Sequence, residues 1–380
     1  MNEHPHPGAS RRAAPPARSL PSFLPACRPA ARLAGGLRAL GTALCAVALA
    51  FSAAAAGAQD KVLNLYSARH YQADEALYSD FTKTTGIRIN RIEAGDEALL
   101  ERLRNEGRNS PADVLMLVDA ARLWKAEEEG LFQPLKSPVL EARIPAHLRS
   151  HDSGAGSHWF SFSLRARVIV HNAAVDGSLV RSYEDLARPE LKGKVCTRSG
   201  AHPYMLSLIG AVSEHLGEPK AEQWARGVVG NFARKPRGGD TEQIKAVAAG
   251  ECGVALTNTY YLVRLMRSDK ADDKAAVAKL KMVWPNQNGV GTHVNVSGAG
   301  LAKHAPNRSA AIRFLEYLAS DSAQVYFAVG NNEWPVVKDV KYDNPALQSL
   351  GTFKADTLPI GAVGRAQAAA SRIIDRAGWR

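Results

Sequence analysis

The sequence predicts an α/β protein of two lobes, joined by a hinge of two crossing strands with a cleft between the lobes. Three observations support this prediction. About 322 residues follow a predicted signal peptide, more than a single hydrophobic core comfortably holds. Strand-like and helix-like segments alternate along the chain, which is typical of parallel sheets covered by helices. Extended stretches at 158–170 and 294–301 separate two such regions and predict the crossings.

The first 58 residues have the composition of a targeting segment. They contain six arginines and one acidic residue, and then an apolar, alanine-rich stretch at 39–56. Small residues at 56–58, before Gln59, fit a signal-peptidase cleavage site. We therefore expect a signal peptide at 1–58, export by the general secretory route and a periplasmic mature protein. The alternative is a membrane anchor, for which this stretch is short and weakly apolar.

Charge gives no sign of a nucleic-acid partner. The chain carries 48 basic and 37 acidic residues, for a net charge of +11. Residues 1–58 hold 6 of these basic residues and 1 of the acidic ones, which leaves 42 against 36 and a net charge of +6. The remaining charges are interspersed, as at 97–108 and 125–129, and this pattern is typical of solvated helix faces.

The first lobe begins with strand-turn-helix units. The apolar run KVLNLY predicts an opening strand, and Leu77 and Phe81 then follow at helical spacing. The pattern continues up to the first crossing. Its predicted elements are a strand at 61–66, a helix at 74–82, a strand at 86–90, a helix at 97–106 and a strand at 113–118.

The second lobe repeats the α/β pattern after the first crossing, in which Arg165 and Arg167 occupy alternate positions. Its predicted elements are a strand at 193–197, helices at 204–216, 221–231 and 241–249, and a strand at 253–257. We then expect helices at 308–320 and 322–330 to pack back on the first lobe, and a surface helix at 363–377. The expected boundaries are 59–160 and 161–293 for the two lobes, and 294–380 for the return to the first lobe with the C-terminal helices.

Two cysteines, Cys196 and Cys252, follow the predicted cleavage site. An even number of cysteines in an exported chain permits a disulfide, and both lie in the same predicted lobe. The alternative is two buried free thiols, because cysteine also behaves as a small apolar residue.

Tyrosines gather where predicted strands end. Tyr260 and Tyr261 follow one strand, Tyr204 starts the helix after another, and His70 and Tyr71 follow the first strand. Ligands of open α/β sheets bind at the carboxyl ends of strands, beside helix N-termini. Each of these residues alone is readily explained as a core, turn or capping residue. Together they predict one imidazole and four phenols around one cleft.

The phenol side chains indicate which metal ion such a cleft could bind. A neutral phenol is a poor ligand, but a hard trivalent cation can displace its proton and bind the phenolate. Zinc and copper sites use clusters of cysteine or histidine, and calcium and magnesium sites use several carboxylates. Because the sequence shows neither pattern at these strand ends, ferric iron is the best fit.

The chain resembles the family of periplasmic ferric-iron-binding proteins, the solute-binding components of iron ABC importers, over nearly the whole mature sequence. The resemblance implies a type II-like periplasmic-binding-protein fold, a likeness to the tyrosine-rich subclass, and delivery of Fe³⁺ to a permease in the inner membrane by a monomer. The matching segments are NLYSARHY at 64–71, SPADV at 110–114, NFARKP at 231–236, QIKAVAAG at 243–250, NTYY at 258–261 and GTHVNVSG at 291–298.

The resemblance also implies the ligands. Tyr71, Tyr204, Tyr260 and Tyr261 would bind the ion as phenolates, and His70 would be a fifth ligand. Four phenolates leave one excess negative charge, and our candidate to offset it is Arg165, whose alternative role is a structural or solvent-facing arginine. If only three phenolates bind the ion, a synergistic anion such as bicarbonate, or a water molecule, would complete its coordination shell.

We expect no enzymatic activity, because neither a nucleophile elbow nor a paired acid set beside a nucleophile is present in the sequence. The competing hypothesis assumes the same fold but a different ligand. An anion or a small organic ligand would then bind to Arg165, Ser199 and helix N-termini.

Overall fold

The computed structural model describes residues 61–69 and 71–380. The predicted signal peptide and the candidate ligand His70 lie outside the described residues. Within the described part of the chain, no helix is both long enough and apolar enough to cross a bilayer.

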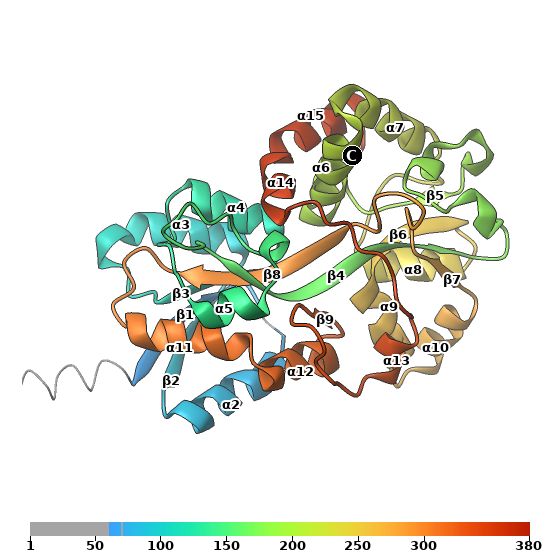
Figure 1. Cartoon of the computed structure of the whole chain (residues 1–380). Helices are drawn as coiled ribbons and strands as arrows, with labels where there is room; N and C mark the ends of the chain where they lie inside the picture. Colours follow the sequence, from blue (N-terminus) through green and yellow to red (C-terminus); the bar gives the residue numbers. More distant parts are fainter. Residues whose placement is uncertain (1–60, 70) are drawn as a thin grey trace, which may run out of the picture. The chain divides into compact units, whose positions relative to one another are not determined.

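One mixed sheet runs through the described residues, in the order β2-β1-β3-β8-β4-β6-β5, with β7 and β9 also paired to β4. Figure 1 shows the strands, and each predicted strand is present with ends that shift by about three residues or less. The strands are β1 Val62–Ser67, β2 Arg88–Glu93, β3 Val114–Leu117, β4 Phe160–His171, β5 Val195–Cys196, β6 Val254–Asn258, β7 Lys281–Val283, β8 Val294–Leu301 and β9 Trp334–Pro335.

The prediction of parallel sheets is correct for the strands of each half, but it is wrong for the strands that cross between the halves. β1 pairs in parallel with β2 and β3, and β5 pairs in parallel with β6. The crossing strands break this pattern, because β8 is antiparallel to both β3 and β4, and β4 is antiparallel to β6. A chain that crosses over and later returns brings its two crossing strands together in opposite directions.

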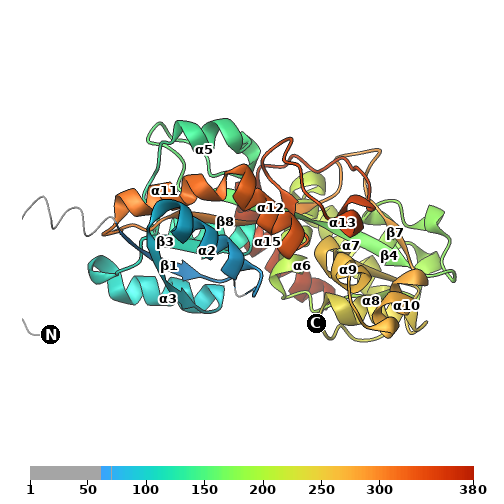
Figure 2. The same ribbon diagram turned by 90° about the horizontal axis from the view of Figure 1, so that it is seen from below.

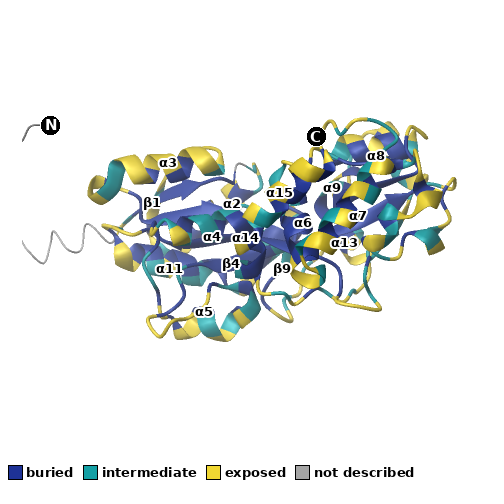
Figure 3. Ribbon diagram, turned by 90° about the horizontal axis from the view of Figure 1, so that it is seen from above, coloured by how far each residue is buried: buried dark blue, intermediate teal, exposed yellow. Residues whose placement is uncertain are grey.

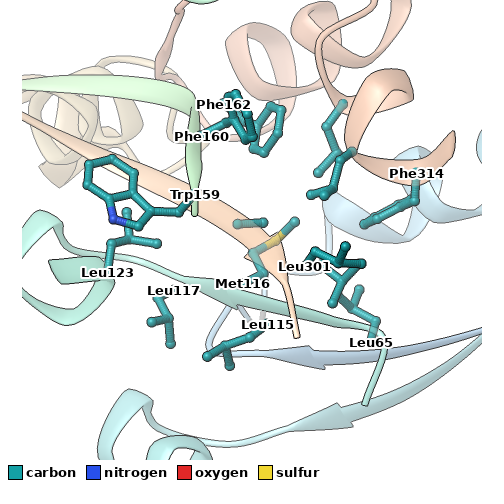
Figure 4. Close-up of a cluster of buried hydrophobic side chains, with 14 of the residues drawn as sticks. Leu65, Leu115, Met116, Leu117, Leu123, Trp159, Phe160, Phe162, Leu301 and Phe314 are labelled. Atoms are coloured by element: carbon teal, nitrogen blue, oxygen red, sulfur yellow. The ribbon is translucent and has the colours of Figure 1, made fainter. Parts of the chain in front are cut away.

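The strand β4 belongs to both halves of the sheet. Its residues 160–166 pair with β8, whereas residues 167–171 pair with β6. Phe160 and Phe162 pack in the core around β1 and β3, but Ile169 and Val170 pack in separate apolar clusters around β5 and β6. Figure 4 shows part of the first core, where Phe160 and Leu301 lie with Leu65 and Phe314.

Within the described part of the chain, six helices surround the first half of the sheet, and they include the predicted helices that return to it. α11 contacts β1 and β8, and α12 contacts α2, as Figures 1 and 2 show. The helices of this half are α2 Asp74–Thr85, α3 Asp96–Glu106, α4 Ala120–Glu128, α5 Pro138–Arg143, α11 Arg308–Leu318 and α12 Asp321–Gly330.

Several of the helices around the second half bury one face and expose the other, whereas the helix at Pro203–Leu216 is buried along most of its length (Figure 3). The helices of the second half are α6 Pro203–Leu216, α7 Glu218–Gly230, α8 Asp240–Ala248, α9 Thr259–Met266, α10 Ala271–Ala278, α13 Pro345–Gln348, α14 Ile360–Arg365 and α15 Gln367–Ala377. Short 3-10 turns occur at Gly107–Asn109, Ala146–Leu148, Gly177–Leu179, Glu184–Ala187 and Pro189–Leu191.

The C-terminal segment differs from the single surface helix predicted at 363–377. It forms two helices, and α14 packs against both α4 and α6. Gly364 allows this close approach, because a Cβ at this position would collide with the Trp124 side chain. α15 then buries Ile373 and Ile374 against α6 and α7, and Trp379 is fully buried beyond its end. The tail therefore completes the fold and does not only cover its surface.

A disulfide joins Cys196, in β5, to Cys252, just before β6. The two cysteines are 56 positions apart in the sequence, and their Cα atoms are 5.8 Å apart. The bond lies among buried apolar side chains of the second half. Closing a loop of this length restricts the unfolded chain by about 4 kcal/mol in the chain-entropy description.

We therefore expect reduction of this disulfide to lower the free energy of unfolding by about 4 kcal/mol. Urea denaturation of the wild type with and without dithiothreitol measures the change. The variant Cys196→Ala/Cys252→Ala controls for other effects of the reductant, because its stability should not respond to dithiothreitol. Equal stability of the oxidised and reduced wild type would contradict the prediction.

Candidate metal centre

Three of the candidate tyrosines lie in the first turns of helices that follow strands. β6 is an entirely buried strand that ends at Asn258, and Tyr260 and Tyr261 are the second and third residues of α9. α6 begins at Pro203, whose fixed φ suits the first helical position, and Tyr204 is next. Tyr71 lies two residues before Ala73, the N-cap of α2.

His202 fixes the start of α6 and the position of Tyr204. Its Nδ1 accepts a hydrogen bond of 3.2 Å from the Tyr204 backbone N–H, and its ring packs edge-on against the Tyr204 ring at 4.6 Å. Burial, with a further effect of Arg198, lowers the pKa of His202 to about 3. The imidazole is therefore neutral and has the lone pair that a capping acceptor needs.

The phenols of the second half lie together. Tyr204 Oη and Tyr260 Oη share a hydrogen bond of 3.0 Å. The rings of Tyr260 and Tyr261 lie 4.2 Å apart at an angle of 31°. Tyr260 is almost completely buried, whereas Tyr204 and Tyr261 are partly exposed. Two helix N-termini that are distant in sequence thus bring three phenols to one place.

Tyr71 approaches this group from the first half. Burial raises the pKa of Tyr71, and the Glu333 carboxylate and Tyr261 raise it further. Burial also raises the pKa values of Tyr204 and Tyr260, and Tyr71 contributes to both increases. All four phenols therefore interact electrostatically. The three with raised pKa values carry their protons at neutral pH.

Arg165 lies beside this group and is not solvent-facing. It is 1% exposed, donates hydrogen bonds to the Val118 carbonyl and to Ser297 Oγ, and lies 5.6 Å from the centre of the Tyr204 ring. Its positive charge opposes the effect of burial on the pKa values of Tyr71, Tyr204 and Tyr260. The same guanidinium approaches Glu333 Oε1 at 3.8 Å, so part of its charge is already balanced.

The sequence interpretation did not identify two other charged residues beside Tyr71. Arg69 is buried, and its guanidinium lies 4.9 Å from the Tyr71 ring centre. It pairs with Asp74 at 2.9 Å and with Glu333 at 3.2 Å, and Glu333 also accepts a hydrogen bond of 2.7 Å from Ser163 Oγ. Arg69, Asp74, Glu333 and Arg165 thus form a buried network of no net charge that joins α2 to β4.

A second charged group lies beside Tyr204 and was also missed. Arg198 lies 5.1 Å from the Tyr204 ring centre and pairs with Asp240 at 3.2 Å. Asp240 also pairs with the buried Arg167 and accepts a hydrogen bond of 2.8 Å from the Asn258 backbone N–H, next to α9. With two arginines and one carboxylate, this group carries one net positive charge. Its carboxylate fixes the end of the strand that presents Tyr260.

Two neighbouring polar residues have other environments. Asp119 caps α4 through a hydrogen bond of 2.8 Å from the Ala121 N–H. It also accepts hydrogen bonds from Asn295 and Ser207. Ser199, named for an anion site, is exposed. Arg165, its intended partner in that site, already binds protein groups.

The donor set suits a hard, highly charged cation. Among residues 61–69 and 71–380, no group of three or more histidine, cysteine, aspartate or glutamate side chains is arranged to hold a metal ion. The converging oxygen donors are phenols, which need an ion able to displace their protons. The residues present therefore fit a trivalent ion better than zinc, copper or calcium.

An α/β scaffold with two crossing strands, and polar donors collected from both of its halves, defines the class of two-lobe solute-binding proteins. The chain belongs to the family of bacterial extracellular solute-binding proteins, whose family model matches residues 109–355.

The chain is similar to proteins that are named for iron uptake or iron binding. Iron uptake protein A1 of Synechocystis sp. is 47% identical over 323 residues, which cover 85% of this chain and 88% of that protein. The Fe(3+)-binding periplasmic protein of Serratia marcescens is 28% identical over 310 residues, which cover 81% of this chain and 88% of that protein.

Solved structures agree with the fold. A Trichodesmium protein in complex with iron and citrate ligands superposes with a TM-score of 0.80 at 51% identity, over 84% of this chain and 100% of that chain. The ferric binding protein from Campylobacter jejuni superposes with a TM-score of 0.77 at 38% identity, over 84% of this chain and 100% of that chain. The predicted two-lobe α/β fold is thus confirmed.

Proposed function

We propose that this protein is a periplasmic receptor for Fe³⁺ that binds the ion through Tyr71, Tyr204, Tyr260 and Tyr261. The observation that carries the proposal is the grouping of these phenols: Tyr204 and Tyr260 share a hydrogen bond of 3.0 Å, and the rings of Tyr260 and Tyr261 lie 4.2 Å apart. Tyr71, from the first half of the sheet, is close enough to all three to affect their electrostatics. The names of the relatives, which refer to iron uptake and iron binding, support the choice of ion. His70 is proposed as a fifth ligand from its sequence position beside Tyr71.

Charge balance supports binding by four phenolates. Four phenolates around Fe³⁺ leave one negative charge, and the group of Arg167, Arg198 and Asp240 carries one positive charge beside Tyr204. Arg165, the residue expected to offset this charge, also lies near Tyr204, but Asp74 and Glu333 balance the charges of Arg165 and Arg69. A synergistic anion such as bicarbonate would be needed if only three phenols bind. The citrate reported with the Trichodesmium protein makes an organic acid a second candidate for that role.

We further propose that β4 and β8 are the hinge between lobes at 59–160 and 161–293, with 294–380 returning to the first lobe. Support comes from β4, whose two ends pack in different apolar cores. An ion held by Tyr71 on one side and by Tyr260 on the other would favour the closed arrangement of the lobes. Ion binding and closure would then be a single equilibrium.

The partner we propose is the permease of an ABC importer in the inner membrane, which would receive the ion from the closed monomer. Membership of the solute-binding family supports this role. We propose a binding role and no catalysis. Export follows from the signal peptide predicted at 1–58.

The test is a visible spectrum of the purified protein titrated with ferric citrate. Phenolate ligation should produce an intense charge-transfer band, and Tyr260→Phe and Tyr261→Phe should each weaken and shift it because each removes one ligand. Tyr326→Phe, on α12, is the matched control and should leave the band unchanged. Spectra unaltered in both site variants would reject this ligand set. A wild type that stays colourless would favour the anion or small organic cargo.

A further inference from the structure

Glu333 is a buried carboxylate that lies between two arginines of the charged network. The residue is 2% exposed and directly precedes β9, which pairs with β4. Its Oε2 accepts hydrogen bonds from Arg69 Nη1 at 3.2 Å and from Ser163 Oγ at 2.7 Å. Its Oε1 lies 3.8 Å from Arg165 Nη1. A single carboxylate therefore joins two guanidinium groups that come from distant parts of the chain.

Each of these two arginines lies beside a different proposed ligand. The Arg69 guanidinium is 4.9 Å from the Tyr71 ring centre, and the Arg165 guanidinium is 5.6 Å from the Tyr204 ring centre. Besides burial, the Glu333 carboxylate raises the pKa of Tyr71, so its negative charge reaches this phenol. Glu333 is thus one side chain away from phenols on both halves of the sheet.

Hydrogen bonding alone does not account for Glu333. Arg69 already donates two hydrogen bonds, of 2.9 and 3.1 Å, to the Asp74 carboxylate. Arg165 donates to Ser297 Oγ at 3.1 Å, and its distance of 3.8 Å from Glu333 is too long for a hydrogen bond. Glu333 therefore acts on Arg165 through its charge.

The charge of the network determines how it acts on a bound ion. Arg69 and Arg165 carry two positive charges, and Asp74 and Glu333 carry two negative ones, so the network is neutral. Four phenolates around Fe³⁺ form a complex with one negative charge. A network without Glu333 would carry one positive charge and would attract this complex. The Glu333 carboxylate removes that attraction.

We propose that Glu333 is a positioning residue that acts through Arg69 and Arg165 and limits the affinity of the site for iron. This inference rests on the proposed function, because it assumes that the phenolates bind Fe³⁺. A receptor that delivers its ion must also release it. Since affinity differences within one site arise mostly in the dissociation rate, the lower affinity speeds release.

The test compares Glu333→Gln with the wild type in two measurements. Competition with citrate at neutral pH, followed by the charge-transfer band, gives the apparent affinity for Fe³⁺. Glu333→Gln should bind Fe³⁺ about tenfold more tightly, because the network becomes positive. Urea denaturation should show that the iron-free variant is less stable than the wild type, because a buried cation loses its partner. A purely structural role predicts weaker iron binding together with the lower stability.

Three further variants separate charge from folding. Glu333→Asp retains the charge and should bind Fe³⁺ as the wild type does. Asp74→Asn removes the other carboxylate of the network and should also tighten binding, so it replaces Glu333→Gln if that variant does not fold. Asp113→Asn is the matched control, because Asp113 is fully buried but precedes β3, at the end of the strand away from the tyrosines. It should lower stability without changing the affinity.

The outcomes distinguish this proposal from the proposed function. Unchanged or weaker iron binding by Glu333→Gln, or by Asp74→Asn in its place, overturns the role of Glu333 while the iron site stands. Equally tight binding by Asp113→Asn also overturns it, because the effect would then not depend on the network. A wild type that shows no charge-transfer band rejects the iron site itself, and the role of Glu333 with it.

Discussion

Binding of Fe³⁺ is expected to release about four protons per ion, one from each tyrosine ligand. Tyr71, Tyr204 and Tyr260 have raised pKa values because they are buried, so they are protonated in the metal-free protein at neutral pH. The ion must displace these protons, and acid competes with it directly. The apparent affinity for free Fe³⁺ should therefore fall by up to about four powers of ten for each unit of decrease in pH.

A pH-stat titration of the metal-free protein measures the number of protons released per ion bound. The acid that the ferric solution itself contributes is measured separately and subtracted. Tyr260→Phe should release about one proton fewer than the wild type, and Tyr326→Phe the same number. Release of about three protons by the wild type would indicate three phenolate ligands and a shell completed by an anion. Iron that stays bound unchanged at about pH 4 would exclude phenolate ligation.

Replacement of Asp240 by alanine is expected to lower the free energy of unfolding by about 3–5 kcal/mol, because it leaves a buried cation without its partner. Arg167 is 2% exposed, and Asp240 is fully buried. The Asp240 carboxylate binds Arg167 and Arg198 and also accepts a hydrogen bond from the Asn258 backbone N–H. Urea denaturation of the iron-free protein measures the loss.

Asp321→Ala is the matched control for this substitution. Asp321 also pairs with an arginine, Arg143, but its side chain is 74% exposed. An exposed pair contributes about 0–1 kcal/mol, so this variant should differ little from the wild type. A loss for Asp240→Ala no larger than for Asp321→Ala would show that the buried pair contributes little to stability.

Local signals in the sequence account for the part of the site that could be predicted. A proline at the first helical position places Tyr204, and the buried run that ends at Asn258 places Tyr260 and Tyr261. Each of these positions depends on neighbours within a few residues. The same reasoning explains why strand and helix positions could be predicted along most of the chain, whereas short elements such as β9 and α13 were missed.

The charged network could not be predicted, because its members are distant in sequence. Arg69 meets Glu333 across 264 residues, and Arg167 meets Asp240 across 73. In the sequence, Glu333 is one acidic residue in a polar loop, and nothing local separates it from an exposed glutamate. The mixed strand directions were missed for a similar reason, since helical and strand periodicity do not specify the direction of a returning strand.

The pairing of β3 with β8 has a consequence for the order in which the chain folds. Val114 lies opposite Leu301, so one edge of the first strand group stays open until nearly two hundred further residues have followed. Loop closure over this separation makes the first core slow to form. A first core that forms late would keep the chain unfolded for longer after synthesis, which the export predicted from residues 1–58 would require.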